Sequence, residues 1–284
     1  MCIRDSPKID GATKLVLGTA SGDRIETVIL RSATGRVSLC VSSQVGCAVR
    51  CRFCATGQLP RVTSLAVSEI LEQVMLANRV LGPERRCVRN VVFMGMGEPL
   101  HNENAVSSAV EKLRSPQHFD LAERRLCVST VGIPEAMERF ARRFPRVGLA
   151  LSLHSARQDR REELIPLARR VSLARLREAM QTCTRIQQKT LMIEYLMLEG
   201  FNDTEEDLDA LCRLLDGIPV HVNLIPYNPI AGFSRYPATT KEGREQFGAA
   251  LRERGHVVTL RYSMGADIDA ACGQLVLKSG TQRR

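Results

Sequence analysis

Short apolar runs alternate with amphipathic segments along most of the chain. Seven apolar runs have the length and composition of strands, and they cover residues 37–43, 90–95, 126–130, 147–154, 191–198, 220–227 and 256–262. Segments with apolar residues at intervals of three and four, which predict helices, cover residues 67–81, 103–113, 134–144, 173–186, 204–217 and 241–255. Strands that alternate with helices form parallel sheets with crossover connections. The pattern therefore favours an α/β fold of the TIM-barrel type, a closed or partly open barrel of about six units.

A different pattern precedes the barrel. Residues 14–30 hold two alternating apolar runs around an Ala-Ser-Gly-Asp turn, which predicts a β-hairpin. We expect a leader and hairpin over residues 1–35, the barrel over 36–277 and a basic tail over 278–284. Residues 1–6, including Cys2, resemble a leader unrelated to the rest of the chain, and the functional interpretation leaves them out.

Composition and charge narrow the class of protein. The chain is 44% hydrophobic and 25% charged, as in globular proteins, and it lacks the run of about 18 apolar residues that a membrane span needs. Without a signal-like segment, we expect a cytoplasmic protein without membrane contact. The formal net charge of +9 favours a polyanionic partner such as nucleic acid. A basic protein without such a partner is the alternative, and we expect each short arginine pair, such as Arg160-Arg161, to lie on a solvated helix face.

Four of the ten cysteines lie close together. Cys47, Cys51 and Cys54 have the spacing C-x3-C-x2-C, and Cys40 precedes Cys47 by seven residues. Outside a secretory context, such a group favours metal binding or redox chemistry over disulfides. Other cysteines stand singly in apolar or helical segments, where we expect buried small side chains; these are Cys87, Cys127, Cys183 and Cys212.

The three clustered cysteines favour an iron–sulfur cluster over zinc. A structural zinc site takes four ligands, commonly from two C-x2-C pairs, and the chain has no second pair. Three thiolates suit a cubane cluster with one iron left open to a substrate or cofactor. Their loop comes after the first predicted barrel strand, at the end of the barrel where sites are built.

The C-x3-C-x2-C spacing, with Phe53 before the last cysteine, resembles the motif of the radical S-adenosylmethionine (SAM) enzymes. Further motifs resemble, in order, the RlmN/Cfr family of RNA adenosine methyltransferases; they are CVSSQVGC, FMGMGEPLHN, STVGIP, SLHS, NLIPYNP and DIDAACGQL. The similarity runs from about Gly11 to Leu275. Members usually carry a small helical domain upstream, so we expect this chain to be a truncated or minimal form.

The resemblance implies an unusual methyl transfer. In this family a [4Fe-4S] cluster on three cysteines binds SAM through its open iron, and the product is methylated at carbon 2 of an adenosine in 23S rRNA, in many members also in tRNA. Cys272 corresponds to the methyl carrier and Cys40 to the thiol that resolves the covalent RNA adduct. Without the resemblance, Cys40 would be an ordinary strand cysteine. The resemblance also implies an electron donor such as flavodoxin or ferredoxin, and we expect a monomer.

Residues at the strand ends correspond to the family's SAM contacts. They are Gly97, Glu98, Ser129, Ser152, Leu153, His154 and Asn228. Glu26 corresponds to the proton acceptor, although one extra residue separates it from Cys40; the alternative is a solvent-facing hairpin glutamate. Arg261, Ser263 and Asp267 are candidates for positioning RNA or shaping the carrier loop.

Two alternatives remain open. A Cfr-type enzyme would methylate carbon 8 of the same adenosine with the same two cysteines. A non-catalytic iron–sulfur protein would keep the barrel and bind RNA, but we would expect it to have lost Cys40 or Cys272, and both are present.

Overall fold

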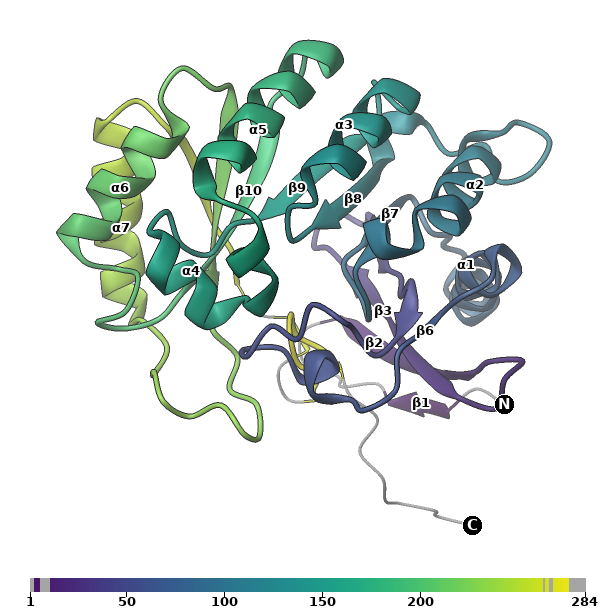
Figure 1. The fold of residues 1–284 in the computed structure, drawn as a ribbon. Helices are drawn as coiled ribbons and strands as arrows, with labels where there is room; N and C mark the ends of the chain where they lie inside the picture. Colours follow the sequence, from purple (N-terminus) through teal and green to yellow (C-terminus); the bar gives the residue numbers. More distant parts are fainter. Residues whose placement is uncertain (1–2, 6–10, 263, 266–267, 276–284) are drawn as a thin grey trace.

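A curved sheet with helices on its outer face forms the body of the protein (Figure 1). The computed structural model describes residues 3–5, 11–262, 264–265 and 268–275. Its larger sheet has the strand order β1-β2-β3-β4-β7-β8-β9-β10-β11-β12. The strands from β4 onward pair in parallel, and β1 to β4 pair antiparallel.

The predicted barrel strands are all present. They are β4 (Val37–Cys40), β7 (Asn90–Phe93), β8 (Leu126–Thr130), β9 (Gly148–Ser152), β10 (Leu191–Met197), β11 (Val220–Pro226) and β12 (Val257–Leu260). Since β12 does not pair with β1, the barrel stays open. The prediction of a partial six-unit barrel is confirmed.

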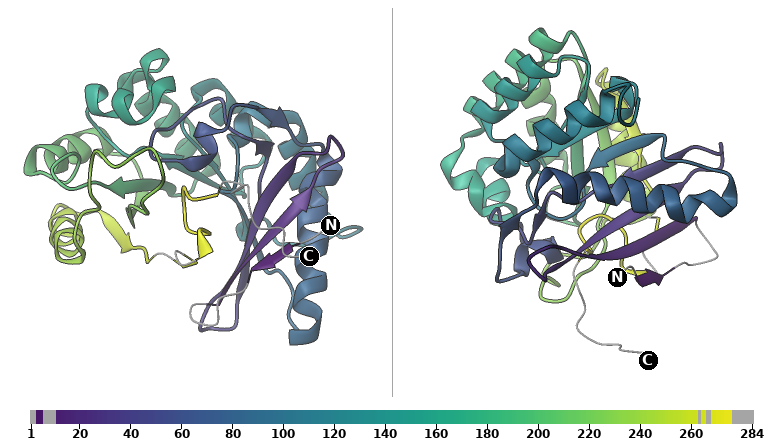
Figure 2. Two further views of the ribbon diagram at one scale, coloured as in Figure 1. Left: turned by 90° about the horizontal axis from the view of Figure 1, so that it is seen from below. Right: turned by 90° about the vertical axis from the view of Figure 1, so that its right-hand side faces the viewer.

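Helices connect successive strands and cover the convex face of the sheet (Figures 1 and 2). They are α1 (Val67–Leu81), α2 (Glu103–Arg114), α3 (Pro134–Arg143), α4 (Gln158–Leu164), α5 (Leu173–Gln187), α6 (Glu205–Leu215) and α7 (Lys241–Glu253). Side chains at the N-caps fix where three of them begin, because Ser172, Thr204 and Thr240 each accept a hydrogen bond from a backbone N–H of the first turn. The apolar pattern missed α4, whose sequence QDRREEL is almost wholly polar.

The first barrel strand ends earlier than predicted. β4 stops at Cys40, and the chain then leaves the sheet because the Ser42 N–H donates to the Gln73 side chain, 2.8 Å away. Residues Gln44–Val45 form β5, which pairs with β6 (Thr63–Ser64) in a separate ribbon. The ribbon closes the base of the cysteine loop.

The predicted hairpin extends the sheet at its N-terminal edge. β2 (Ala12–Gly18) and β3 (Arg24–Arg31) pair antiparallel, and β3 continues onto β4. Residues Ile3–Asp5, part of the predicted leader, form the short strand β1 against β2. Both edges of the curved sheet face the segment that comes after β12 (Figure 2).

Two apolar clusters hold these layers together. The large one joins the sheet to the helices and includes Phe93, Phe140 and Tyr195. A smaller cluster lies under the cysteine loop and includes Val49, Leu164 and Phe201. None of the helices in the described part of the chain is both long and apolar enough to cross a membrane.

Acid should weaken the fold through His154, which is buried where β9 ends. Its Nδ1 accepts a hydrogen bond from Leu196 N, 3.0 Å away, and desolvation, followed by the charge of Arg161, lowers its pKa to about 3. A lowered pKa favours the neutral imidazole, so its stabilisation is complete above pH 6.5 and is lost as pH falls toward 3. Below pH 6.5 the free energy of unfolding of wild type should fall up to about 1.4 kcal/mol per pH unit more steeply than that of His154→Asn. Urea unfolding of the cluster-free proteins from about pH 7 to 4.5 measures this, and parallel curves would contradict it.

The turn after β7 requires glycine at position 97. Gly97 has φ of 97°, and an added Cβ would lie 2.6 Å from the Gln44 Cβ. Gly200 also has positive φ, 67°, but open space around it. Gly200→Ala should therefore cost about 1–2 kcal/mol from the backbone alone, and Gly97→Ala about 1–3 kcal/mol more through the clash. Equal losses in urea unfolding would show that the close approach is unimportant.

Candidate active site

The cysteine loop lies at the carboxyl end of the barrel, fixed by its own backbone. Its last part is the 3-10 helix η1 (Ala55–Gln58). The Cys54 N–H donates to Cys51 O at 3.2 Å, and Arg52 N–H donates to Leu164 O of α4 at 2.9 Å. The loop is thus held between the β5–β6 ribbon and α4, with its three cysteines partly exposed.

The three thiols lie close enough to affect one another. Burial raises the pKa of Cys51 well above its usual value, and the thiols of Cys54 and Cys47 raise it further. Backbone N–H groups counter this at two of the sulfurs, from Val49 and Arg50 at Cys47 and from Thr56 and Gly57 at Cys54. Hydrogen bonds to sulfur are typical of iron–sulfur sites, so the donor set and its surroundings fit a cluster.

A single metal ion fits less well. Within the described residues, no group of three histidine, cysteine, aspartate or glutamate side chains is arranged to hold one ion. A cubane cluster differs, because each cysteine binds its own iron.

Cys40 and Cys272 are brought together although they are far apart in sequence. Cys40 ends β4, and burial followed by the Cys272 thiol raises its pKa. Cys272 reaches solvent, yet the surrounding protein raises its pKa to about 11, and Glu194 adds to the rise. The two thiols therefore share one electrostatic environment inside the mouth of the barrel.

The loop that carries Cys272 is fastened to the cysteine loop and to the end of β11. Ala55 N–H donates to Gly273 O at 2.7 Å, and Thr56 Oγ1 donates to Leu275 O at 2.6 Å. Asn228, a predicted SAM contact, donates from Nδ2 to Cys272 O at 3.2 Å. These bonds hold Cys272 beside the cysteine loop.

The predicted SAM contacts line neighbouring strand ends. Gly97 and Glu98 follow β7, and the Glu98 carboxylate accepts from Leu100 N at 2.9 Å and from Val131 N at 2.8 Å. Burial nevertheless raises the Glu98 pKa to about 7. Ser129 and Ser152 face each other from β8 and β9, their hydroxyls 3.4 Å apart.

Leu153 and His154 follow Ser152 and complete this set. Both donate their backbone N–H groups to Glu194 O of β10. The His154 ring meets Phe53 of the cysteine loop edge to face at 4.7 Å. The strand end and the cysteine loop are therefore in direct contact.

Glu26 lies inside the protein. It stands on β3 with 2% of its surface exposed, which excludes the alternative of a solvent-facing residue. Its carboxylate pairs with Lys14 Nζ at 3.3 Å, and the same Nζ donates to Asp269 O at 3.4 Å. The hairpin is thereby linked to the segment that precedes Cys272.

Several polar residues at the site were not predicted from the sequence. Glu194 is buried on β10, accepts from Asn223 Nδ2 at 2.8 Å and raises the pKa of both Cys272 and Cys127. Arg161 is buried against the cysteine loop, so the prediction of a solvated pair with Arg160 was wrong for it. The sequence did contain a signal for Glu194, because a charged residue inside the apolar strand LMIEYLM indicates a functional position.

The predictions for the single cysteines and for the residues near Cys272 are confirmed only in part. Cys127 and Cys183 are buried as expected, but Cys87, in the connection between η2 (Gly82–Glu84) and β7, is exposed, and Cys212 on α6 is half-buried. Arg261 influences Cys272 electrostatically and is exposed. Ser263 and Asp267 lie outside the described residues.

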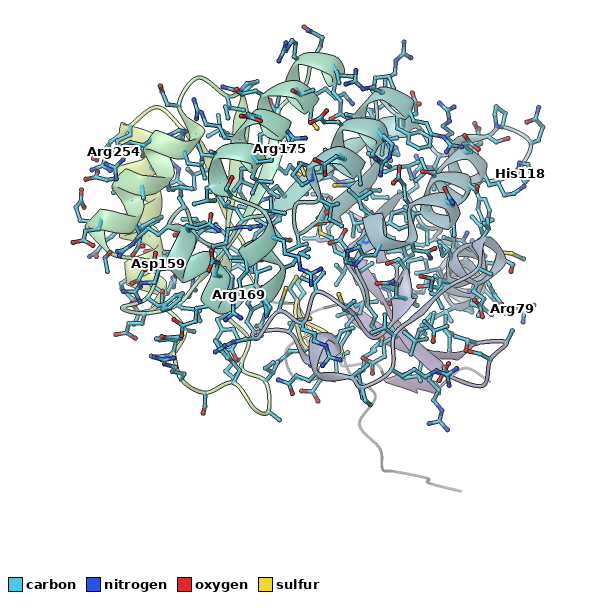
Figure 3. The ribbon with its side chains drawn as sticks, in the orientation of Figure 1. Arg79, His118, Asp159, Arg169, Arg175 and Arg254 are labelled. Atoms are coloured by element: carbon cyan, nitrogen blue, oxygen red, sulfur yellow. The ribbon has the colours of Figure 1, made fainter. Side chains whose placement is uncertain are left out.

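Many cations on the outer helices are paired with acids. Arg175 pairs with Glu138 at 2.9 Å, and Arg254 with Asp209 at 2.7 Å; Figure 3 shows Arg175 on α5 and Arg254 at the end of α7. A recess of about 590 Å³ beside the cysteine loop differs, because it is lined by Arg50 and Arg52, which form no ion pair with any described residue. Positive charge therefore remains available next to Cys51.

Comparisons with known proteins agree with this geometry. Residues 41–215 match the radical SAM superfamily. The chain is 51% identical over 280 residues to a "Probable RNA methyltransferase" of Rhodopirellula baltica, covering 99% of this chain and 74% of that protein. It is 42% identical over 270 residues to the "Probable dual-specificity RNA methyltransferase RlmN" of Chlorobium phaeobacteroides, covering 94% of this chain and 74% of that protein.

A solved structure matches across almost the whole fold. The crystal structure of a radical SAM methyltransferase from Sphaerobacter thermophilus superposes with a TM-score of 0.92 at 38% identity, covering 97% of this chain and 80% of that one. The family implies a [4Fe-4S] cluster and SAM as cofactors. The chain belongs to the radical SAM superfamily and, within it, to the RNA methyltransferases of the RlmN type.

Proposed function

We propose that the protein methylates carbon 2 of an adenosine in 23S rRNA, and of a tRNA adenosine as well. The observation that carries the proposal is the approach of Cys40 to Cys272 beside the three-cysteine loop. Two thiols poised for exchange have no role in a methyl transfer by direct attack on SAM. Carbon 2 of adenine lies between two ring nitrogens and is too electron-poor for such an attack.

Cys47, Cys51 and Cys54 would hold the cluster and leave one iron open for SAM. When bound, the cluster and SAM supply a 5′-deoxyadenosyl radical. The carboxylate of Glu98 complements the SAM ammonium group, and Ser129 and Ser152 offer hydroxyls to its polar groups. Gly97, Leu153, His154 and Asn228 shape the rest of this pocket at the strand ends.

Cys272 would carry a methyl group taken from one SAM. A hydrogen atom of this methyl group passes to the 5′-deoxyadenosyl radical, and the resulting carbon radical adds to carbon 2 of the base. Glu26 takes the proton from carbon 2 of the adduct, which requires its carboxylate to separate from Lys14, and the one electron that leaves the adduct would be accepted by the cluster. The Cys40 thiolate then attacks the Cys272 sulfur, and the sulfur–carbon bond breaks. Its electron pair passes to the departing carbon, which is protonated to a methyl group, while the two sulfurs are oxidised to a disulfide.

The partners are inferred from charge and redox state. Arg50 and Arg52 provide unpaired positive charge for an RNA backbone at the mouth of the barrel. A low-potential donor such as flavodoxin or ferredoxin would reduce the cluster. The cytoplasm, whose thiol systems keep cysteines reduced, would restore the Cys40 and Cys272 thiols, and the protein would act as a monomer.

The position of methylation separates this proposal from its nearest alternative. Protein-free 23S rRNA treated with the reconstituted protein, SAM and reductant should yield 2-methyladenosine in nuclease digests analysed by mass spectrometry. A product methylated only at carbon 8 would establish the Cfr-type reaction instead. Cluster formation without 5′-deoxyadenosine would favour a non-catalytic iron–sulfur protein.

Replacing the resolving thiol should trap the reaction halfway. In Cys40→Ala, methylation of Cys272 and attachment to RNA proceed, but nothing attacks the Cys272 sulfur. Denaturing gels should show a protein–RNA adduct and at least about a hundredfold loss of released product, as expected for a missing nucleophile. Cys87→Ala, which removes an exposed cysteine, is the control and should turn over normally. Free turnover by Cys40→Ala would disprove the resolving role.

Loss of one clustered thiol should abolish cluster binding. Cys47→Ala leaves two of the three ligands, so anaerobic reconstitution should incorporate little iron and sulfide and generate no 5′-deoxyadenosine. Cys183→Ala, at a buried cysteine away from the loop, should load normally. Iron and sulfide analysis measures the effect, and full loading of Cys47→Ala would refute the ligand assignment.

A further inference from the structure

Arg161 is an unusual residue for its position. It belongs to α4, has 1% of its surface exposed and is the largest fully buried side chain described. The neighbouring Arg160 stacks over the Phe201 ring at 4.8 Å and stays half-buried. Of these two adjacent arginines of α4, Arg160 therefore remains partly exposed to solvent and Arg161 is buried.

The buried guanidinium has few partners. Its Nη2 donates to Val131 O at 2.6 Å, while its Nε has no hydrogen-bond partner. Among the described residues, no carboxylate lies within ion-pair distance of it. A buried charge without a counter-ion is costly, so a negative group absent from the polypeptide is expected next to it.

The surroundings of Arg161 belong to the cysteine loop. The residue three positions further along, Leu164, accepts a hydrogen bond from Arg52 N at 2.9 Å. Val131, which accepts from Arg161, donates its own N–H to Glu98 at 2.8 Å. Burial lowers the pKa of Arg161 to about 10, and Cys51 opposes that change. Arg161 therefore stands beside the cysteine loop, and only the Val131 residue separates it from Glu98, the proposed partner of the SAM ammonium group.

We propose that Arg161 is the internal counter-ion of the iron–sulfur cluster and stabilises its reduced form. Each electron added to the cluster adds negative charge, and a fixed cation in a medium of low dielectric lowers the energy of that state. Arg161 is a positioning and charge-compensating residue, not a ligand. The inference rests on the cluster that the family implies and is independent of the RNA substrate.

The positive charge of Arg161, more than the shape of its side chain, should stabilise the reduced cluster. Two replacements separate these contributions: Arg161→Met keeps a similar volume without the charge, whereas Arg161→Lys keeps the charge on a smaller head group. Arg160→Met removes one positive charge from the same helix at a position screened by solvent and is the matched control.

The test is the midpoint potential of the reconstituted full chain without SAM or RNA. Redox titration with dithionite and mediators, followed by electron paramagnetic resonance of the reduced cluster, gives the ratio of reduced to oxidised cluster. At the wild-type midpoint this ratio should fall about tenfold or more in Arg161→Met, equal to about 59 mV for one electron. Arg161→Lys should recover most of the ratio, and Arg160→Met should change it less than about twofold, as screened surface charges do.

Each outcome decides the inference. Cluster loss from Arg161→Met with retention by Arg161→Lys would support it, since the charge alone then determines binding. An unchanged potential in Arg161→Met, or cluster loss from both variants, would overturn it in favour of a purely structural role. Because no RNA is present, failure of RNA methylation by the wild-type chain leaves this measurement intact.

Discussion

The candidate active site depends on two hydrogen bonds that join the cysteine loop to the segment around Cys272. Ala55 N–H binds Gly273 O, and Thr56 Oγ1 binds Leu275 O across 219 positions of sequence. They attach the loop that contains Cys272 to the cysteine loop, although all the parallel strands of the barrel from β7 onward lie between these two loops in the sequence. The last described segment returns to the first barrel strand, so that the Cys272 thiol lies near enough to raise the pKa of Cys40.

Buried charge is the second constraint. Glu98, Arg161 and Glu194 all lie within the mouth of the barrel with little exposed surface. Each is costly in a protein interior, and each is held by backbone or amide groups more than by an opposite charge. Ligands of complementary charge would lower this cost, which agrees with the [4Fe-4S] cluster and SAM that the family implies.

The fold could be predicted well because strand and helix patterns are local. Residues 67–81 were predicted as a helix and form α1 with the same bounds, and residues 126–130 likewise form β8. The cysteine loop could also be predicted from local sequence, since three cysteines within eight residues must lie close together. The proximity of Cys40 and Cys272 could be predicted only through family resemblance, because no local pattern relates residues so far apart, and their functional pairing stays a prediction.

The burial of charged residues could not be predicted in this way. Arg160 and Arg161 are identical in sequence terms, and only the packing of α4 against the cysteine loop distinguishes them. Similarly, β4 ended early because the Gln73 side chain, 31 positions away, binds the Ser42 backbone. Side chains from other elements decide these features, and their positions depend on tertiary structure.

The approach of Cys40 to Cys272 is the central claim and can be measured directly. The cluster-loaded chain, which protects Cys47, Cys51 and Cys54, is mildly oxidised, alkylated, digested without reductant and analysed by mass spectrometry. The account predicts a disulfide-linked pair of peptides that contain Cys40 and Cys272. Recovery of Cys40 as the alkylated thiol, or linked to any other cysteine, would contradict it.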